Sequence, residues 1–158
     1  MIFITNTDFE ALVKMKKKFS SPNIIRIPAR RGEEAKGIRV DSIYAKESFL
    51  FDADCGGKIE LRYKTQLRHK KGFAIPMVRF EVNAPPHTNP DGRILSRNHV
   101  HIYKEGYGDL RSLPWAYEYD EIFKGIEIPN DPYDLFDLFC EYCSIDISRI
   151  GHSQLSYL

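Results

Sequence analysis

The sequence is poor in several features that define special classes of protein. It has only three cysteines in 158 residues, an odd number, which argues against a disulfide scaffold and is typical of a reducing compartment. No run approaches the roughly 20 apolar residues of a membrane span. The first residues also lack a basic stretch before an apolar one. We therefore expect a cytoplasmic protein without a membrane partner.

The short motifs of several common enzyme classes are also missing. The glycine-rich residues 105–109 have neither the lysine of a P-loop nor the glycine spacing of a dinucleotide-binding fold. There is no nucleophile elbow, H-E-x-x-H or EF-hand pattern. The one C-x-x-C, Cys140 and Cys143, has no second C-x-x-C to complete a zinc site, and we interpret both residues as buried thiols. The motifs thus predict no cofactor.

Net charge is close to zero, but it is unevenly distributed. Residues 1–79 hold 17 Lys and Arg against 9 Asp and Glu, a balance of +8, whereas residues 80–158 hold 6 against 13, a balance of −7. Such a division is typical of a basic face for a polyanion, or of two halves that neutralise each other on folding. Composition leaves both interpretations open.

What the chain does contain is a set of helical and alternating patterns that fill one domain. Helical spacing predicts a helix over residues 7–19, with Thr7 and Glu10 as a capping box, and a second over 132–143, with Asp131 as N-cap. Short apolar or alternating runs predict strands. These runs cover residues 23–28, 38–44, 48–54, 58–64, 77–82, 98–104 and 115–119. We expect a single α+β domain over all 158 residues. Its antiparallel sheet should have about four to six strands, with both helices on one face and a polar opposite face.

Three of the five histidines fall within residues 87–101, in and after a long polar loop. As a strand, residues 98–104 place His99, His101 and Tyr103 on one side. If this strand pairs with residues 77–82, Arg79 and Glu81 lie beside the histidines. We expect this shared face to be in contact with solvent.

The two histidines allow three interpretations, one of which is acid/base chemistry without a metal. Acting on a phosphodiester, His99 and His101 would move protons, with Tyr103 beside them, and Arg79 would stabilise the developing charge. A metal site would need a third ligand, for which His87, Glu105 and Asp109 are candidates. The third interpretation is ordinary hydrogen-bonded histidines.

The same face offers residues that would bind a nucleic acid. Lys58, Arg62 and Lys64 would contact flanking phosphates, and Tyr103, Tyr107 and Trp115 would stack on unpaired bases. His87 lies in the polar loop, which is longer than the usual hairpin connection and would reach over the histidines. The alternative for the basic strand is a soluble sheet face balanced by Glu60 and Glu81.

Three segments carry a family resemblance: PPHTNPDG at 85–92, NHVHIYKEGYGD at 98–109 and WAYE at 115–118. They resemble a bacterial and prophage family of small proteins of unknown function, which pairs an H-x-NPDG loop with an H-x-H-x-Y-x-EGYGD strand and a W-A-Y. The match covers roughly residues 50–120, although this sequence inserts residues 110–114 before the tryptophan. The resemblance implies an accessory role in mobile elements, as a toxin or an inhibitor of host defence.

Three hypotheses of function follow. The first is a toxin-like endoribonuclease that acts on nucleic acid, RNA rather than DNA, through His99 and His101. The second is a prophage-encoded inhibitor, without catalysis, that binds a host-defence or antitoxin protein through its aromatic side chains and its acidic C-terminal half. The third is a metal enzyme with His87, His99 and His101 as ligands.

Overall fold

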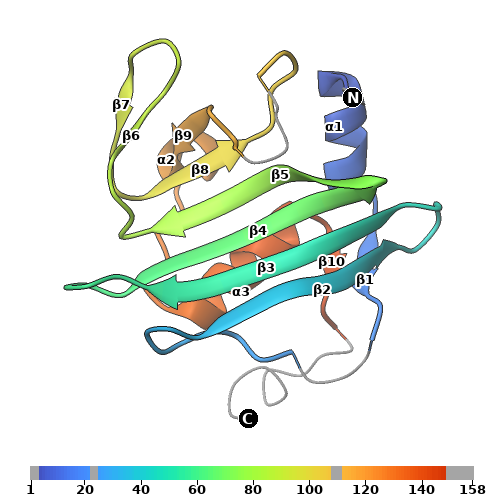
Figure 1. Cartoon of the computed structure of the whole chain (residues 1–158), viewed down its shortest axis with the longest axis horizontal. Helices are drawn as coiled ribbons and strands as arrows, with labels where there is room; N and C mark the ends of the chain where they lie inside the picture. Colours follow the sequence, from blue (N-terminus) through green and yellow to red (C-terminus); the bar gives the residue numbers. More distant parts are fainter. Residues whose placement is uncertain (1–3, 22–24, 108–111, 149–158) are drawn as a thin grey trace.

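The computed structural model describes residues 4–21, 25–107 and 112–148, and one large sheet forms its centre (Figure 1). Its strands are β1 (Lys17–Phe19), β2 (Glu34–Ser42), β3 (Ser48–Gly56), β4 (Arg62–Lys71), β5 (Phe73–Val82), β8 (His99–Ile102), β9 (Ala116–Glu118) and β10 (Ile145–Asp146). The spatial order is β10-β1-β2-β3-β4-β5-β8-β9, and every neighbouring pair is antiparallel except β1 with β10. A separate ribbon pairs β6 (His87–Thr88) with β7 (Ile94–Leu95).

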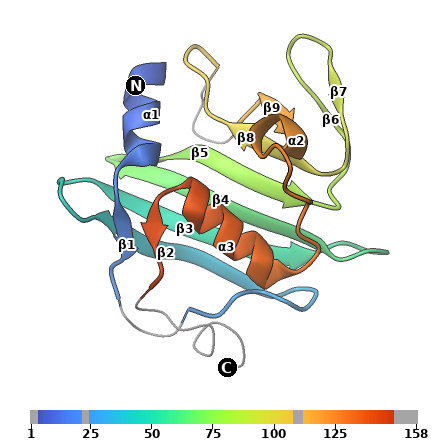
Figure 2. The same ribbon diagram turned by 180° about the vertical axis from the view of Figure 1, so that it is seen from behind.

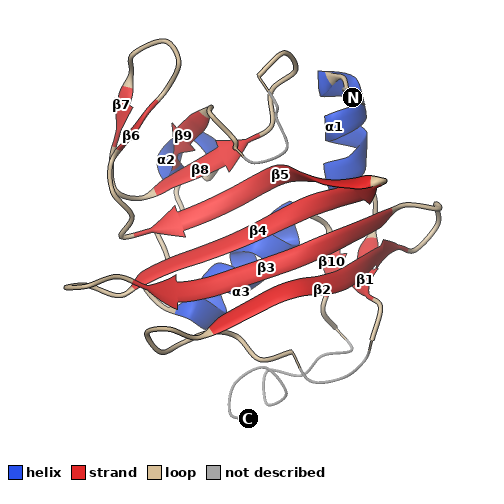
Figure 3. Ribbon diagram, in the orientation of Figure 1, coloured by secondary structure: helices blue, strands red, loops and turns tan. Residues whose placement is uncertain are grey.

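Three helices accompany the sheet: α1 (Asn6–Lys14), α2 (Tyr119–Ile122) and α3 (Pro132–Tyr142). Figure 2 shows α3 lying across one face of the sheet. There Phe136 and Phe139 contact Phe51 of β3, with ring centroids 5.5 and 5.8 Å apart. The side of β2–β5 opposite α3 faces the viewer in Figure 3 and carries no described helix. We call this side the polar face.

The α+β class agrees with the sequence-based prediction, but eight strands form the sheet rather than four to six. The difference lies in β1 and β10, at one edge, which have three and two residues. Strands this short are below the length at which alternation becomes recognisable. The strand expected near Trp115 is present as β9.

The predicted N-terminal helix is too long and its cap is misplaced. The helix ends at Lys14, and its N-cap is Thr5, whose side chain accepts from the Asp8 amide. The chain then turns so that Lys17, which is 0% exposed, donates to the carbonyls of Val13 and Cys143. The apolar spacing continues past Lys14, but the backbone becomes extended at Met15 and the helix ends there. The second helix has Asp131 as its N-cap, as expected.

The predicted strand over residues 58–64 is displaced along the chain. Lys58 lies in the turn before β4, and Ile59 is 95% exposed rather than buried. The strand instead continues through the basic segment 68–71. Residues 25–28 form no strand, although Ile25 and Ile27 are buried.

A register shift between β4 and β5 changes the face of one residue. Leu67 pairs with Val78, but Arg68 pairs with Pro76, so Met77 has no direct partner on β4 and is 0% exposed in the core. Such a bulge interrupts the alternation of a strand. Met77 therefore lies in the core, whereas Arg79 and Glu81 keep the side expected for them.

No helix in the described part of the chain is long and apolar enough to cross a membrane.

Candidate functional site

Strands β5 and β8 bring a carboxylate and two imidazoles together on one side of the sheet. Glu81 is the register partner of His99, and Arg79 is the partner of His101. Directly opposed residues of an antiparallel pair project to the same face, and so do residues two apart on one strand. His99 and His101 therefore share a side with Glu81, as the alternating sequence predicts.

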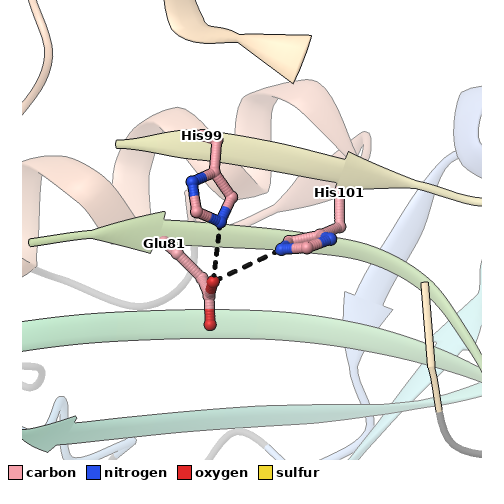
Figure 4. Close-up of side chains that lie close together, drawn as sticks. All are labelled: Glu81, His99 and His101. Carbon is pink, nitrogen blue, oxygen red and sulfur yellow. Dashed lines mark hydrogen bonds and ion pairs between the residues drawn. The ribbon is translucent and has the colours of Figure 1, made fainter. Parts of the chain in front are cut away.

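Both imidazoles converge on one oxygen of Glu81 (Figure 4). Nε2 of His99 lies 2.9 Å from Oε2 of Glu81, and Nε2 of His101 lies 3.3 Å from the same oxygen. One ligand atom from each of the three side chains lies within 4.8 Å of the others. We call these three residues the Glu81–His99–His101 cluster.

The other ring nitrogen of each histidine contacts a backbone carbonyl. Nδ1 of His99 lies 2.8 Å from the oxygen of Ser96, and Nδ1 of His101 lies 2.7 Å from the oxygen of Leu113. A carbonyl oxygen can only accept, so each Nδ1 donates its proton. A neutral imidazole has one N–H, which leaves each Nε2 without a proton opposite the carboxylate of Glu81.

The cluster is buried, contrary to the expectation of a solvent-exposed face. His99 and His101 are 1% and 4% exposed. His87 from the β6–β7 ribbon and the Leu113 backbone lie against them. Alternation in a sequence identifies the two faces of a strand, but it does not show that a loop covers the second face.

Burial and hydrogen bonds act in opposite directions on the ionisable groups of the cluster. For Glu81, burial acts to raise the pKa, whereas N–H donation and positive charge from His101 and His99 lower it and prevail, so the pKa lies well below its usual value. For His101, burial is the dominant effect and lowers the pKa. An ionised Glu81 thus favours a proton or another cation between itself and the rings, while burial of His101 opposes a proton on that ring.

His87 lies next to the cluster but does not complete it. Its ring centroid is 4.6 Å from that of His101 and 5.7 Å from that of His99, and its Nε2 donates to the carbonyl of Pro114 at 2.8 Å. The third potential ligand is Glu81, not the predicted His87. Strand pairing was the signal that identified it, since Glu81 was expected beside the histidines. Glu105 accepts from the Asn6 amide instead, and Asp109 lies outside the described residues.

The basic residues expected to bind phosphate are largely neutralised within the protein. Lys64 pairs with Asp54 at 3.0 Å, and Arg62 lies 3.7 Å from the second oxygen of Glu81. Arg79 donates from Nε to the neutral side chain of Gln66 at 2.8 Å. Lys58 lies outside the sheet in the exposed turn. The polar face is thus a network of ion pairs, rather than a basic surface.

The predicted aromatic residues are divided between the core and the surface. Tyr103 is 5% exposed and donates its hydroxyl to the carbonyl of Ile4 at 2.8 Å, so it does not join the histidines. Tyr103 follows the end of β8, where the alternation of the strand no longer applies. Trp115 is half-buried beneath Tyr107 and the ammonium of Lys104, which lies 4.0 Å from its ring centroid.

The cysteines take no part in the cluster. All three are free and buried, which confirms the interpretation of Cys140 and Cys143 as buried thiols. Burial raises the pKa of Cys143 to about 12 and that of Cys140 well above its usual value. Thiols held protonated in this way are poor nucleophiles and poor metal ligands.

Comparisons with known proteins give a family but no activity. No curated protein and no solved structure matches this chain. A model of one family matches residues 4–145, which include the whole cluster and nearly all of the fold. The bacterial and prophage association expected from the sequence stays a prediction. By this match the chain belongs to DUF6978, a family of unknown function.

Proposed function

We propose that this protein is a metal-dependent enzyme whose Glu81, His99 and His101 bind one divalent transition metal ion. The observation that supports it is the hydrogen-bond mismatch in the cluster. Each imidazole donates Nδ1–H to a carbonyl and directs a bare Nε2 at the same anionic oxygen. A cation between these three atoms removes the repulsion.

Protonation of both histidines and binding of a divalent ion would each give the three side chains a net charge of +1, so charge does not separate the two alternatives. The geometry favours the metal ion. It explains the carbonyl contacts, because metal-binding histidines usually donate their second ring N–H to a backbone carbonyl or a carboxylate.

Two of the three ligand separations in the cluster fit a single ion, and the third, between the two Nε2 atoms, is within 4.8 Å and would have to shorten on binding. Bonds of about 2.0 to 2.2 Å to nitrogen and oxygen place neighbouring ligand atoms about 3 to 3.5 Å apart in octahedral or tetrahedral geometry. The two separations between Nε2 and Oε2 are 2.9 and 3.3 Å. Two imidazoles and one carboxylate suit zinc or iron(II).

Three protein ligands favour catalysis over a purely structural role. Structural zinc sites are usually closed by four protein ligands, whereas catalytic sites keep a position for water or substrate. A bound metal of this kind supplies a Lewis acid and an activated water. The exposed side of the cluster is that of Glu81, whose side chain is 13% exposed and faces Arg62. Substrate would approach there, from the polar face.

The metal-free acid/base hypothesis receives less support from this geometry. Each histidine would need a ring nitrogen directed at the substrate, yet both nitrogens of both rings contact protein acceptors. Endoribonuclease activity with RNA as partner therefore stays a prediction, as does binding to a host protein through Tyr107 and Trp115.

Titration of chelator-treated protein with Co²⁺ and Zn²⁺ tests the proposal. We expect one equivalent of Co²⁺ to give visible d–d absorption without a thiolate charge-transfer band, because the ligands are nitrogen and oxygen. Zn²⁺ should displace it. His99→Ala and Glu81→Gln should weaken binding by more than about 100-fold, the upper range for changes to groups that only support a ligand.

His69 provides a matched control. It is 3% exposed and contacts the half-buried Glu47 at 2.7 Å, so it is another histidine–glutamate pair, but it lies on the core side of β4 beside Phe49. His69→Ala should keep wild-type stoichiometry and affinity. Equal metal binding by wild type and His99→Ala would overturn the proposal.

A further inference from the structure

The polar face contains a hollow over β2–β5 with a volume of about 430 Å³. Charged and amide side chains form most of its wall. They include Asp52, Asp54, Lys64, Gln66, Arg68 and Arg79. We call it the Arg79 hollow, because that residue also borders the Glu81–His99–His101 cluster.

Two of the cations in the hollow are neutralised by neighbouring carboxylates. Arg68 donates from Nε and Nη2 to the two oxygens of Asp52, at 2.6 and 2.7 Å. Lys64 lies 3.0 Å from Asp54. A bidentate pair and a close ion pair leave little attraction for an external anion.

Arg79 differs from these cations. Its one hydrogen bond to the described residues runs from Nε to the neutral amide of Gln66. Both terminal nitrogens make none, and neither is sealed from solvent. The half-buried guanidinium therefore presents an unused two-nitrogen fork with a positive charge that no carboxylate contacts.

The position of Arg79 connects the hollow to the cluster. Arg79 is the register partner of His101 and precedes Glu81 by two residues on the same face of β5. Two residues along a strand correspond to roughly 7 Å. A small molecule held by the Arg79 guanidinium would thus be close enough for its other end to reach the Glu81–His99–His101 cluster.

We propose that the Arg79 hollow binds the carboxylate group of a small organic acid, with the guanidinium of Arg79 as its bidentate partner. The single positive charge of the Arg79 guanidinium matches a monoanion, and the geometry of the fork matches a carboxylate. Asp52 and Asp54 are paired with cations, but the carboxylate of Glu34 lies in the same wall and disfavours a dianion such as phosphate. The role of this acid as a substrate rests on the proposed metal function. Its binding to Arg79 does not depend on that function.

The test is a titration of metal-free protein with acetate, followed through the side-chain Nε–H signals of arginine in ¹H–¹⁵N NMR spectra. We expect the Arg79 signal to shift saturably with acetate and to shift less with inorganic phosphate at the same concentration. Arg79→Gln should weaken acetate binding by at least about tenfold, the effect of losing one charge-assisted pair. Lys58→Gln, which removes an exposed cation outside the hollow, is the matched control and should bind as wild type does.

Three outcomes would overturn the proposal: no saturable shift in wild type, equal binding by Arg79→Gln, or stronger binding of phosphate than of acetate. Repeating the titration with Zn²⁺-loaded protein separates the two ideas. Acetate binding in a protein that takes up no Zn²⁺ would refute the metal site and support the Arg79 hollow. Zn²⁺ uptake without acetate binding would support the metal site and refute the proposal for the Arg79 hollow.

Discussion

At the scale of single residues, two buried polar sites differ in whether their hydrogen bonds are complete. The ammonium of Lys17 has three donors and three acceptors, the carbonyls of Val13, Met15 and Cys143, at 2.8, 2.9 and 2.7 Å. In the Glu81–His99–His101 cluster the acceptors outnumber the available protons. A complete network has a structural role, whereas an incomplete one points to a missing partner.

Lys17 gives the protein a defined dependence of stability on pH. Burial lowers its pKa from 10.5 to about 8. Between these values the unfolded state binds the proton more strongly, so the free energy of unfolding should rise with pH from about 8 to 10.5. The contribution is on the order of 3 kcal/mol. Urea unfolding at several pH values should show this rise in wild type and its loss in Lys17→Met.

Other groups also titrate in this range, so the difference between the two proteins is the quantity to compare. Lys18→Met on the exposed side of β1 removes a lysine without removing the buried network. It should keep the wild-type slope. Identical slopes for wild type and Lys17→Met would show that Lys17 does not carry the effect.

The sequence predicts some of this residue-scale detail and not the rest. Alternation in residues 77–82 and 98–104 placed Arg79, Glu81, His99 and His101 on one side, which the register confirms. It did not predict their burial, because the covering contacts come from His87 and Leu113, outside both strands. Sequence spacing describes one strand at a time, whereas burial depends on segments that are distant in the chain.

At the scale of elements, helix boundaries depend on which side chain caps the first turn. The spacing of Thr7 and Glu10 predicts a cap at Thr7, whereas the structure caps the helix with Thr5 and Asp8. Thr5→Ala should therefore reduce the free energy of unfolding by about 1 kcal/mol, while Thr7→Ala should change it by less than about 0.5 kcal/mol. Chemical denaturation of the two variants measures this directly, and a larger effect at Thr7 would contradict the observed cap.

The polar loop between β5 and β8 is fixed to the sheet by Asn89. Its amide donates to the carbonyl of Ala116 and accepts from the Ala116 amide, both at 2.9 Å, and Asn89 is 4% exposed. These two bonds hold the loop against β9 as a strand neighbour would. The H-x-NPDG motif thus contributes His87 beside the cluster and Asn89 as its anchor.

Asn89→Ala should loosen this cover. Loss of two hydrogen bonds, with buried groups of Ala116 left unsatisfied, should lower the free energy of unfolding by roughly 2 to 4 kcal/mol. Zn²⁺ affinity should fall as well, because the β6–β7 ribbon shields the ligands. Denaturation and Zn²⁺ titration of the same preparation check both effects. Exposed Asn130→Ala should change neither, and full Zn²⁺ affinity in Asn89→Ala would separate the loop from the site.

Element-scale prediction succeeded where a pattern was long and failed where tertiary contacts decided. Helix α3 has an N-cap, an N-terminal proline and a regular apolar stripe, and it lies where expected. Strand β4 was displaced because residues 58–61 imitate its alternation in an exposed turn. The shortest strands, such as β10, form only because a neighbouring strand pairs with them.

At the scale of the whole molecule, the cluster connects parts of the chain that are distant in sequence. Glu81 belongs to β5 and the histidines to β8, while their outer nitrogens contact Ser96 and Leu113 from the flanking segments. A metal ion bound here would link the centre of the sheet to its β8–β9 edge. Its binding energy would therefore stabilise the fold rather than one loop.

Thermal unfolding measures this stabilisation. A ligand that binds only the folded state at 100 times its Kd adds about 2.7 kcal/mol. For a domain of this size each kcal/mol raises Tm by about 2 to 4 °C, so saturating Zn²⁺ should raise it by roughly 5 to 10 °C.

Glu81→Gln should lose most of the shift, since the amide is a weaker ligand, while His69→Ala should keep it in full. Mg²⁺ should give a much smaller shift, because two of the three ligands are imidazoles. A shift of equal size in Glu81→Gln would mean that the ion stabilises the protein from somewhere other than the junction of β5 and β8.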